Sequence, residues 1–308
     1  MTDSQTDILR RAWGAVSKVK DVLTGTQLAG RNLTVFDDDI FIASYPRSGN
    51  TWTRFLISNL VHPDEPSTFA NIESRIPEIY FNPDRRMRNL PRPRILKSHE
   101  CFEPQYSRII YIVRDPRDVA VSFYHHNVKA GNLPDNYPME LFIRRFIAAE
   151  FDRKWGSWSD HVSSWLALRE DRPEFLLLRY ENMKTDPIRE LQRICSFLRH
   201  NSFPPIDTSF PALERAVELS SCERMRKLEM TEGKKWVLTK DTRHDKPFVR
   251  TGIAGGWKKT LSPDAVASIE AAWGPLMHRL GYEPVEIQVR HELSPRFISE
   301  ATPTRDRG

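Results

Sequence analysis

The chain has 308 residues, with 46 lysines and arginines against 41 aspartates and glutamates, for a formal net charge of +5 when histidine is neutral. This length suits one large α/β domain or two small ones, and it excludes a small disulfide scaffold or a short repeat unit. A composition of 39% apolar and 28% charged residues is typical of a folded chain, and so modest a charge does not by itself indicate nucleic-acid binding.

The N-terminal segment, residues 1–36, has apolar side chains at roughly helical spacing with arginines and lysines between them, so we expect a helical extension that lies on the body. It lacks the apolar core of a signal peptide, and no stretch of the chain approaches the roughly 18 apolar residues of a membrane span. Three widely separated cysteines, Cys101, Cys195 and Cys222, are typical of free thiols in a reducing compartment. We therefore expect a cytoplasmic protein without stable membrane insertion.

A strand, a loop and a helix follow. Residues 40–44 are a short apolar run of strand length. Residues 50–61 have apolar positions three and four apart, which predicts a helix, and Asn50 and Thr51 are the predicted caps. The loop between them therefore presents backbone N–H groups and a positive helix end at one point, as in an anion site.

Further strands and helices alternate along the chain. Strands are predicted at residues 94–99, 108–113 and 175–180, with a helix from about Pro116 and helical spacing through Leu198. This alternation predicts an α/β fold in which a single domain, residues 37–290, has a mainly parallel central sheet flanked by helices. Residues 231–256 predict a long functional loop, and residues 291–308 a loose C-terminal tail.

Some other clusters have a structural interpretation that we prefer. Asp37–Asp39 predict a solvated turn rather than a metal site, and the arginines between residues 85 and 94 predict a solvated loop on the substrate side. Of the adjacent His125 and His126, we expect one to face the core and the other a cleft. Three tryptophans are expected to pack in the core rather than to line a ligand-binding pocket: Trp155, Trp158 and Trp165.

The loop at residues 45–52 reads Tyr-Pro-Arg-Ser-Gly-Asn-Thr-Trp. Gly49 allows close approach of the backbone to an anion, Arg47 can bind two oxygens, and the hydroxyls of Ser48 and Thr51 add donors. It is not a Walker A loop, because the second glycine and the lysine of that motif are absent. A P-loop-like strand-loop-helix site for an anion is therefore predicted.

This loop resembles the Tyr-Pro-Lys-Ser-Gly-Thr-Thr-Trp loop of the cytosolic-type sulfotransferases, which holds the 5′-phosphosulfate of PAPS (3′-phosphoadenosine 5′-phosphosulfate). Residues 114–122 resemble the 3′-phosphate motif of that family, which implies that Arg114 and Ser122 bind the phosphate. Residues 180–184 resemble its Tyr-Glu-Asp-Met-Lys motif, which implies an adenine contact for Tyr180.

Two more segments extend the resemblance toward the C-terminus. Residues 220–225 lie where the family has an adenine-contacting segment, and residues 250–258 resemble its Arg-Lys-Gly-x-x-Gly-Asp-Trp-Lys signature. The resemblance implies PAPS as co-substrate, PAP as product and no required metal. The implied nucleotide-binding residues are Arg47, Ser48, Gly49, Asn50, Thr51, Trp52, Arg114, Ser122, Tyr180, Ser220, Cys222, Met225, Arg250, Thr251 and Gly252.

The sequence Lys97-Ser98-His99 resembles the Lys-Thr-His of the family, which implies that His99 is the general base and that Lys97 supports the sulfuryl group. A hydroxyl acceptor needs a base whose pKa lies near neutrality, and histidine meets that need. Arg47 takes the place of a lysine at the 5′-phosphate and the bridging oxygen. Because sulfuryl transfer resembles phosphoryl transfer in having a loose transition state, cationic donors around the developing charge are expected to do most of the catalysis.

The chain departs from the family pattern at four points. Arg47 replaces a lysine, Cys222 an aromatic residue that would stack on adenine, and Thr251 a lysine at the 3′-phosphate. The short dimer motif of the family is degenerate from Lys258 to Ala267, so we do not predict that mode of dimerisation.

The sequence thus predicts a sulfotransferase that acts by in-line transfer with a histidine base. Its acceptor is a small molecule, glycan or lipid with a hydroxyl or, less commonly, an amine, and we expect no nucleic-acid partner. Two alternatives stay open at this point. One is a Mg²⁺-dependent, P-loop-like nucleotide kinase, and the other is a basic, non-catalytic polyanion-binding module.

Overall fold

The computed structural model describes residues 27–151 and 153–285. The apolar positions that predict the N-terminal helix, and the whole predicted tail, lie outside these ranges. Residues 27–36 are described, and they contain the 3-10 turn η1 (Gly30–Asn32) rather than a continued α-helix.

The four predicted strands form one parallel sheet, which confirms the predicted fold class. The strands are β1 (Ile40–Ser44), β2 (Ile95–Ser98), β3 (Arg108–Val113) and β4 (Phe175–Arg179). Their order in the sheet is β2-β1-β3-β4, with Phe41 of β1 opposite Leu96 on one side and Ile109 on the other. Parallel neighbours need long crossovers, and these carry the helices.

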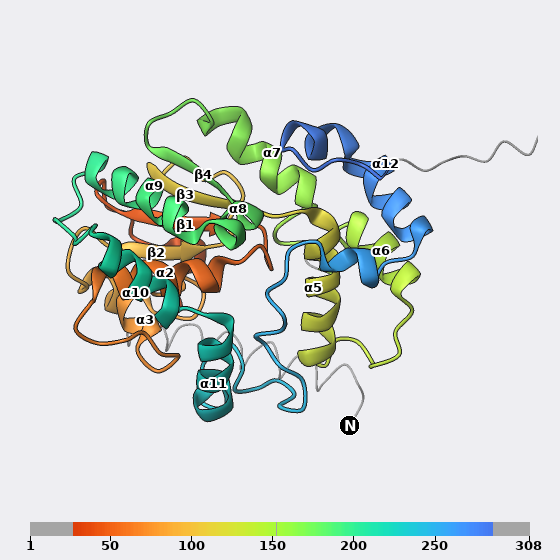
Figure 1. The fold of residues 1–308 in the computed structure, drawn as a ribbon, viewed down its shortest axis with the longest axis horizontal. Coiled ribbons are helices and arrows are strands. Elements are labelled where there is room, and N and C mark those ends of the chain that lie inside the picture. The colour runs from red at the N-terminus through yellow and green to blue at the C-terminus, as the bar shows by residue number, and fades with distance from the viewer. Residues whose placement is uncertain (1–26, 152, 286–308) are drawn as a thin grey trace, which may run out of the picture.

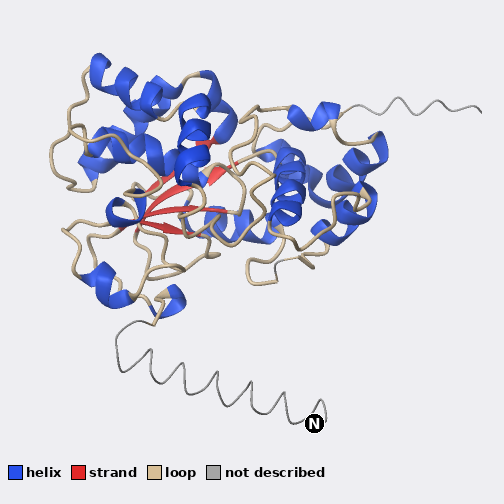
Figure 2. Ribbon diagram, turned by 90° about the horizontal axis from the view of Figure 1, so that it is seen from below, coloured by secondary structure: helices blue, strands red, loops and turns tan. Residues whose placement is uncertain are grey.

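Helices lie on both sides of the sheet (Figures 1 and 2). Alternate residues of β1 belong to two different apolar clusters, with Phe41 and Ala43 in one and Ile40 and Ile42 in the other. The first face packs against α5 (Pro116–Lys129), α6 (Met139–Ile147), α7 (Trp158–Arg169) and α12 (Pro263–Arg279). The second packs against α2 (Asn50–Val61), α8 (Tyr180–Thr185), α9 (Pro187–His200) and α10 (Phe210–Leu219). Burial of both faces explains the continuous apolar runs of the strands.

The remaining elements belong to the connections. These are α3 (Ile72–Arg75), α4 (Asp84–Arg88), α11 (Cys222–Glu232) and η2 (Gly256–Lys259). The chain between α11 and η2 contains no helix or strand, so the predicted long loop is present and runs from residue 233 to 255.

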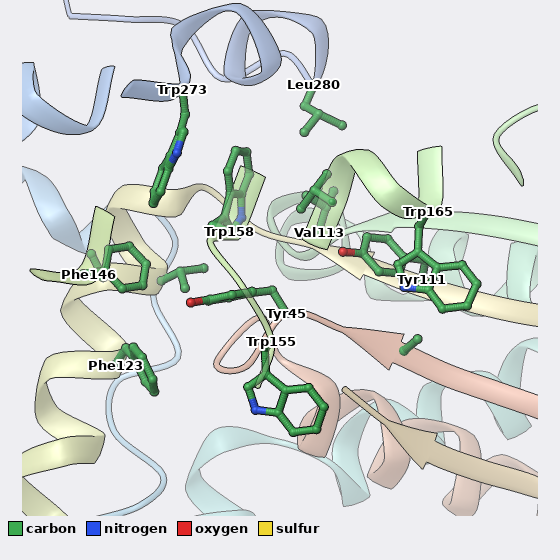
Figure 3. Packing of buried hydrophobic residues seen from close by; sticks show 14 of the residues in the cluster. Tyr45, Tyr111, Val113, Phe123, Phe146, Trp155, Trp158, Trp165, Trp273 and Leu280 are labelled. Carbon is green, nitrogen blue, oxygen red and sulfur yellow. The ribbon is translucent and has the colours of Figure 1, made fainter. Parts of the chain in front are cut away.

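Aromatic side chains fill the first face of the sheet. Trp155, Trp158 and Trp165 are all buried there. Trp158 and Trp165 lie in the core as predicted, whereas Trp155 also lines the cavity described below. Figure 3 shows Trp158 near Trp273 of α12, and their ring centroids are 5.5 Å apart. These rings pack α7 and α12 against the first face of the sheet. Such close packing of aromatic side chains holds the helices firmly in place.

The start of α2 differs from its prediction. Gly49, with a φ of 102°, is the residue before the helix, and no side chain of the described residues caps the first turn. The side-chain amide of Asn50 instead donates to the carbonyl oxygen of Ile42 and to the hydroxyl of Ser44, each at 3.2 Å. Because the N–H groups of this turn are left without a side-chain cap, they can bind an anion.

The predicted solvated turn at residues 37–39 is also only partly correct. Asp39 is buried and forms an ion pair with Arg94, which is buried as well, and it accepts the backbone N–H of Phe36. Asp38 and Arg92 pair at 2.5 Å in a more exposed position. One member of each charged cluster therefore has a structural role, because a buried charge needs an opposite charge and hydrogen bonds.

Candidate active site

The predicted site residues gather at one edge of the sheet. Parallel strands end at the same edge, and each of the four strands is followed there by part of the predicted site. Arg47 follows β1, His99 follows β2, Arg114 follows β3 and Tyr180 follows β4. β1 and β3 are neighbours whose next strands lie on opposite sides, which is where ligands of open α/β sheets bind.

A cavity of about 560 Å³ opens at this edge. Most of the predicted residues line it: Arg47, Gly49, Asn50, Thr51, Trp52, Lys97, His99, Arg114, Ser122, Tyr180, Cys222, Met225, Arg250, Thr251 and Gly252. Ser48 and Ser220 are buried and are not part of the lining. The Ser220 hydroxyl accepts from Asn59 at 2.9 Å, and its carbonyl oxygen accepts the indole N–H of Trp52 at 3.0 Å. Ser220 therefore orients Trp52.

Tyr180 packs directly on the loop at residues 45–52. A Cβ at Gly49 would lie 2.5 Å from the Tyr180 ring, so only glycine allows this approach. The Tyr180 hydroxyl donates to the carbonyl oxygen of Gly252 at 2.9 Å, and the Arg114 guanidinium lies 4.2 Å from the ring centroid. One ring thus connects the loop after β1, the residue after β3 and the segment near Gly252.

Three arginines face the cavity from different elements. Arg47 has a φ of 71°, and its Nε donates to the Ser122 hydroxyl at 3.3 Å. Burial, together with the charges of Arg114 and Arg250, lowers the pKa of Arg47 to about 10. It still carries its charge at neutral pH. Mutually repelling cations in one cavity are stabilised by an anionic ligand.

Unpaired polar atoms also indicate an anion. The Ser48 hydroxyl and the Nε of Arg114 are buried, and neither has a hydrogen-bond partner among the residues that the structure describes. Buried polar groups are normally satisfied, so such atoms point to a missing partner. They fit a phosphate or sulfate group at the loop.

Asp118 organises the opposite wall of the cavity. Its carboxylate accepts the backbone N–H of Gly255 at 2.7 Å and of Trp257 at 2.9 Å, and it lies 3.7 Å from Arg114. The segment that begins at Arg250 is thereby fixed to α5. The Cys222 thiol adds a contact to the Arg250 carbonyl oxygen at 3.4 Å.

His99 is held by its main chain and its ring. The ring Nδ1 lies 2.7 Å from the carbonyl oxygen of Ser44. Its own carbonyl oxygen lies 2.9 Å from Nε2 of His161, whose Nδ1 lies 2.8 Å from the Tyr111 hydroxyl. Because a carbonyl oxygen only accepts, His161 donates from Nε2 and accepts from Tyr111 at Nδ1. This buried pair fixes the position of His99.

Burial and the nearby Lys97 ammonium lower the pKa of His99 well below its ordinary value. Its imidazole is therefore neutral at neutral pH, but its pKa lies below the near-neutral value expected of a general base. Lys97 is itself buried, and its Nζ lies 2.5 Å from a carboxylate oxygen of Glu78. Burial lowers the pKa of Lys97, while Glu78 opposes that shift and favours the charged form.

The cavity also includes residues outside the predicted set. Glu78, Lys184 and Phe248 line it. His126 lines it as well, so one of the two adjacent histidines faces a cleft as expected, whereas His125 is only partly buried and does not lie in the core. The Nδ1 of His126 is buried without a partner among the described residues, and burial lowers the pKa of His126 to about 3. No motif contains Glu78, which lies in an irregular segment between the motifs. Phe248 lies in the predicted functional loop, two residues before Arg250, but nothing in the sequence singled out its side chain.

Neither a metal cluster nor a membrane helix is found in the part of the chain that the structure describes. Within residues 27–151 and 153–285, no three histidine, cysteine or acidic side chains are grouped as metal ligands would be. None of the helices in these ranges is long and apolar enough to cross a membrane.

The fold is that of an α/β protein with a P-loop-like strand-loop-helix, and the residues of its cavity fit an anion. The sulfotransferase domain family matches residues 37–281 of this chain. Sulfotransferase 1B1 of Canis lupus familiaris is 30% identical over 237 residues, which cover 72% of this chain and 77% of that protein. Sulfotransferase 1A1 of Bos taurus is 32% identical over 241 residues, which cover 73% and 78%.

Structural similarity agrees with this match. The crystal structure of mouse sulfotransferase SULT7A1 complexed with PAP has a TM-score of 0.64 and 26% identity, and the match covers 81% of this chain and 87% of that chain. The structure of retinol dehydratase in complex with androsterone and inactive cofactor PAP has a TM-score of 0.63 at 20% identity and supports the fold. The chain belongs to the sulfotransferase family and is a sulfotransferase enzyme.

Proposed function

We propose that this sulfotransferase uses PAPS as its donor and transfers the sulfuryl group in line to a hydroxyl acceptor, with His99 as the general base. The observation that carries the proposal is the meeting of a neutral, oriented imidazole with three arginines and an uncapped helix N-terminus in one cavity. The similar mouse enzyme whose structure contains PAP supports the choice of donor.

The residues of the cavity fit a nucleotide with phosphate or sulfate groups at two places. The loop around Gly49 and the side chain of Arg47 would hold the 5′ end, where the Ser48 hydroxyl has no partner within residues 27–151 and 153–285. Arg114, Ser122 and Arg250 would hold the 3′-phosphate. Tyr180 and Trp52, whose rings meet edge to face at 5.6 Å, would enclose the adenine. When bound, PAPS supplies an activated sulfuryl group.

The protein groups then have distinct tasks. His99 takes the proton of the acceptor hydroxyl at its Nε2, because its Nδ1 already donates to Ser44. Arg47 and Lys97 place positive charge where negative charge develops during the transfer. The pairing with Glu78 holds Lys97 in the charged form that this task requires.

Aromatic side chains form much of the wall near His99. The Trp155 ring lies 6.0 Å from the His99 ring, and Tyr80 and Phe123 line the same cavity. Flat apolar surfaces favour a ring-bearing acceptor, while Glu78 and His126 offer hydrogen bonds to polar substituents. A small molecule with a hydroxylated ring fits best among the acceptors expected from the sequence.

Transfer of ³⁵S from labelled PAPS tests this function directly. The acceptor panel would contain a phenol, a sterol, a sugar and a tyrosine peptide, each with and without EDTA. We expect labelled product from at least one acceptor, with the same rate in EDTA. Mg²⁺-dependent transfer from ATP, or PAP binding without transfer to any acceptor, would favour the kinase or the binding module instead.

A further inference from the structure

An ion pair with little exposure to solvent lies outside the lining of the cavity. Lys129 ends α5 and Glu229 lies in α11, and their side chains are only 4% and 12% exposed. The Lys129 Nζ lies 3.6 Å from the Glu229 carboxylate. Neither residue belongs to the motifs that the sequence resembles, and neither lines the cavity.

Both residues bind the main chain of one segment, residues 243–250, which we call the strap. The Lys129 ammonium donates to the carbonyl oxygens of Arg243 at 2.9 Å and Lys246 at 2.6 Å. The Glu229 carboxylate accepts the N–H groups of Phe248 at 2.5 Å and Val249 at 2.8 Å. One buried and one partly buried charge therefore hold the strap at both ends, and they do so through its backbone.

The strap brings Phe248 into the donor side of the cavity. The Arg47 guanidinium lies 4.8 Å from the Phe248 ring centroid. A planar guanidinium stacks on an aromatic face, whereas a lysine ammonium has no plane to align. Phe248 thus provides a platform for Arg47, while the Nε of Arg47 donates to Ser122. Arg250, at the end of the strap, lines the same cavity.

We infer that Lys129 and Glu229 are positioning residues for the donor site, which act by holding the strap so that Phe248 orients Arg47. The inference rests on the proposed donor site. The same strap also carries exposed ion pairs of Arg243 and Lys246 with Asp135, whose side chain is 52% exposed. Exposed pairs contribute little, so Asp135 provides a matched control on the same segment.

Binding of PAP, measured by titration calorimetry, tests the inference. Lys129→Met keeps the length of the side chain but leaves two carbonyl oxygens without their donor and the Glu229 carboxylate without its opposite charge. A loop detaches more easily than a core unfolds, so the expected result is a Kd for PAP raised about tenfold or more. Glu229→Gln, which is nearly isosteric, is expected to raise the Kd about three- to tenfold, and Asp135→Ala less than about twofold.

A double-mutant cycle with Phe248→Ala separates positioning from general stability. If Lys129 acts through Phe248, Lys129→Met adds less than about a twofold loss once Phe248 is already alanine. Hydrogen exchange of residues 243–250 is expected to accelerate in Lys129→Met, with the sheet unchanged. Should Lys129→Met fail to fold, the same cycle is run with Glu229→Gln.

Two results would overturn the inference. One result is that Lys129→Met weakens PAP binding by the same factor whether residue 248 is phenylalanine or alanine. The other is that Lys129→Met and Glu229→Gln both bind PAP as tightly as the wild type. A wild-type protein that does not bind PAP at all would instead refute the donor site and, with it, the role assigned to the strap. The two failures are therefore distinguishable.

Discussion

The ring Nδ1 of His99, at the end of β2, lies 2.7 Å from the carbonyl oxygen of Ser44, the last residue of β1. This contact assigns the tautomer, because a carbonyl oxygen can only accept a hydrogen bond. The proton is on Nδ1, and Nε2 carries a free lone pair. The end of β1 thus orients the His99 imidazole, at the end of the neighbouring β2, through a backbone carbonyl oxygen.

His99→Asn is the first test of this arrangement. The asparagine side chain can still donate to Ser44, but it offers no basic nitrogen. We expect kcat to fall by about 10² to 10⁴ while the Kd for PAP changes by less than about threefold. Initial rates of ³⁵S transfer and calorimetry measure the two quantities. The control is His125→Asn, because His125 does not line the cavity. If His99→Asn kept more than about a tenth of the wild-type rate, His99 would not be the base.

Gly49→Ala is expected to weaken PAP binding severely. An added Cβ would lie 2.5 Å from the Tyr180 ring at a φ of 102°, so the ring must move away from the loop. We expect affinity to drop at least about tenfold, from strain and displacement together. Gly131→Ala has a φ of 78° but nothing within 4 Å of its Cβ. It should lower the melting temperature while leaving PAP affinity unchanged, and equal affinity losses in both variants would refute the steric argument.

Asp118→Asn tests the support of the far wall. An asparagine offers one acceptor oxygen and an amide group that would face a backbone N–H, whereas the aspartate accepts from both Gly255 and Trp257. We expect the Kd for PAP to rise about fivefold or more and the free energy of unfolding to fall by about 1 to 3 kcal/mol. Urea unfolding and calorimetry give both values. An unchanged Kd would show that this wall does not contribute to the donor site.

Acid should destabilise the protein through its buried histidines. Burial lowers the pKa of His161 to about 4. The unfolded chain, with an ordinary histidine pKa near 6.5, therefore binds more protons between about pH 6.5 and 4, and stability declines as the pH falls through that window. His161→Gln can still donate to the His99 carbonyl and accept from Tyr111. The melting temperature of His161→Gln should decline less between pH 7 and pH 5 than that of the wild type. An equal decline in the two proteins would show that His161 does not cause the loss of stability in acid.

The sequence predicted the architecture well because its signals are local. Apolar runs of strand length located all four strands, and the alternation with helical spacing indicated a parallel sheet. The loop at residues 45–52 was recognisable because its glycine, hydroxyls and arginine are adjacent in the chain. The carboxyl ends of parallel strands meet at one edge, so the convergence of Arg47, His99 and Arg114 also followed from the order of the elements.

Contacts between segments far apart in the chain could not be predicted from these local signals. Asn50 was expected to cap its helix, yet its amide binds the end of β1, and Asp39 was expected in solvent, yet it is buried against Arg94. Asparagine can cap a helix or bind a distant strand, and aspartate can lie in solvent or in a buried ion pair. The residue type allows either position, and the partner that the fold brings within reach decides between them. The pairing of Lys97 with Glu78 is of the same kind.

The sequence by itself determined the fold class and the family and predicted the site residues of the loop at residues 45–52, because these depend on periodicity and on motifs of neighbouring residues. Only the tertiary structure decided the tautomer of His99, the platform of Phe248 beneath Arg47 and the hold of Lys129 and Glu229 on the strap. Each of these joins residues far apart in the chain. Their energies come from burial and directional hydrogen bonds, which exist only once the core has placed the partners side by side.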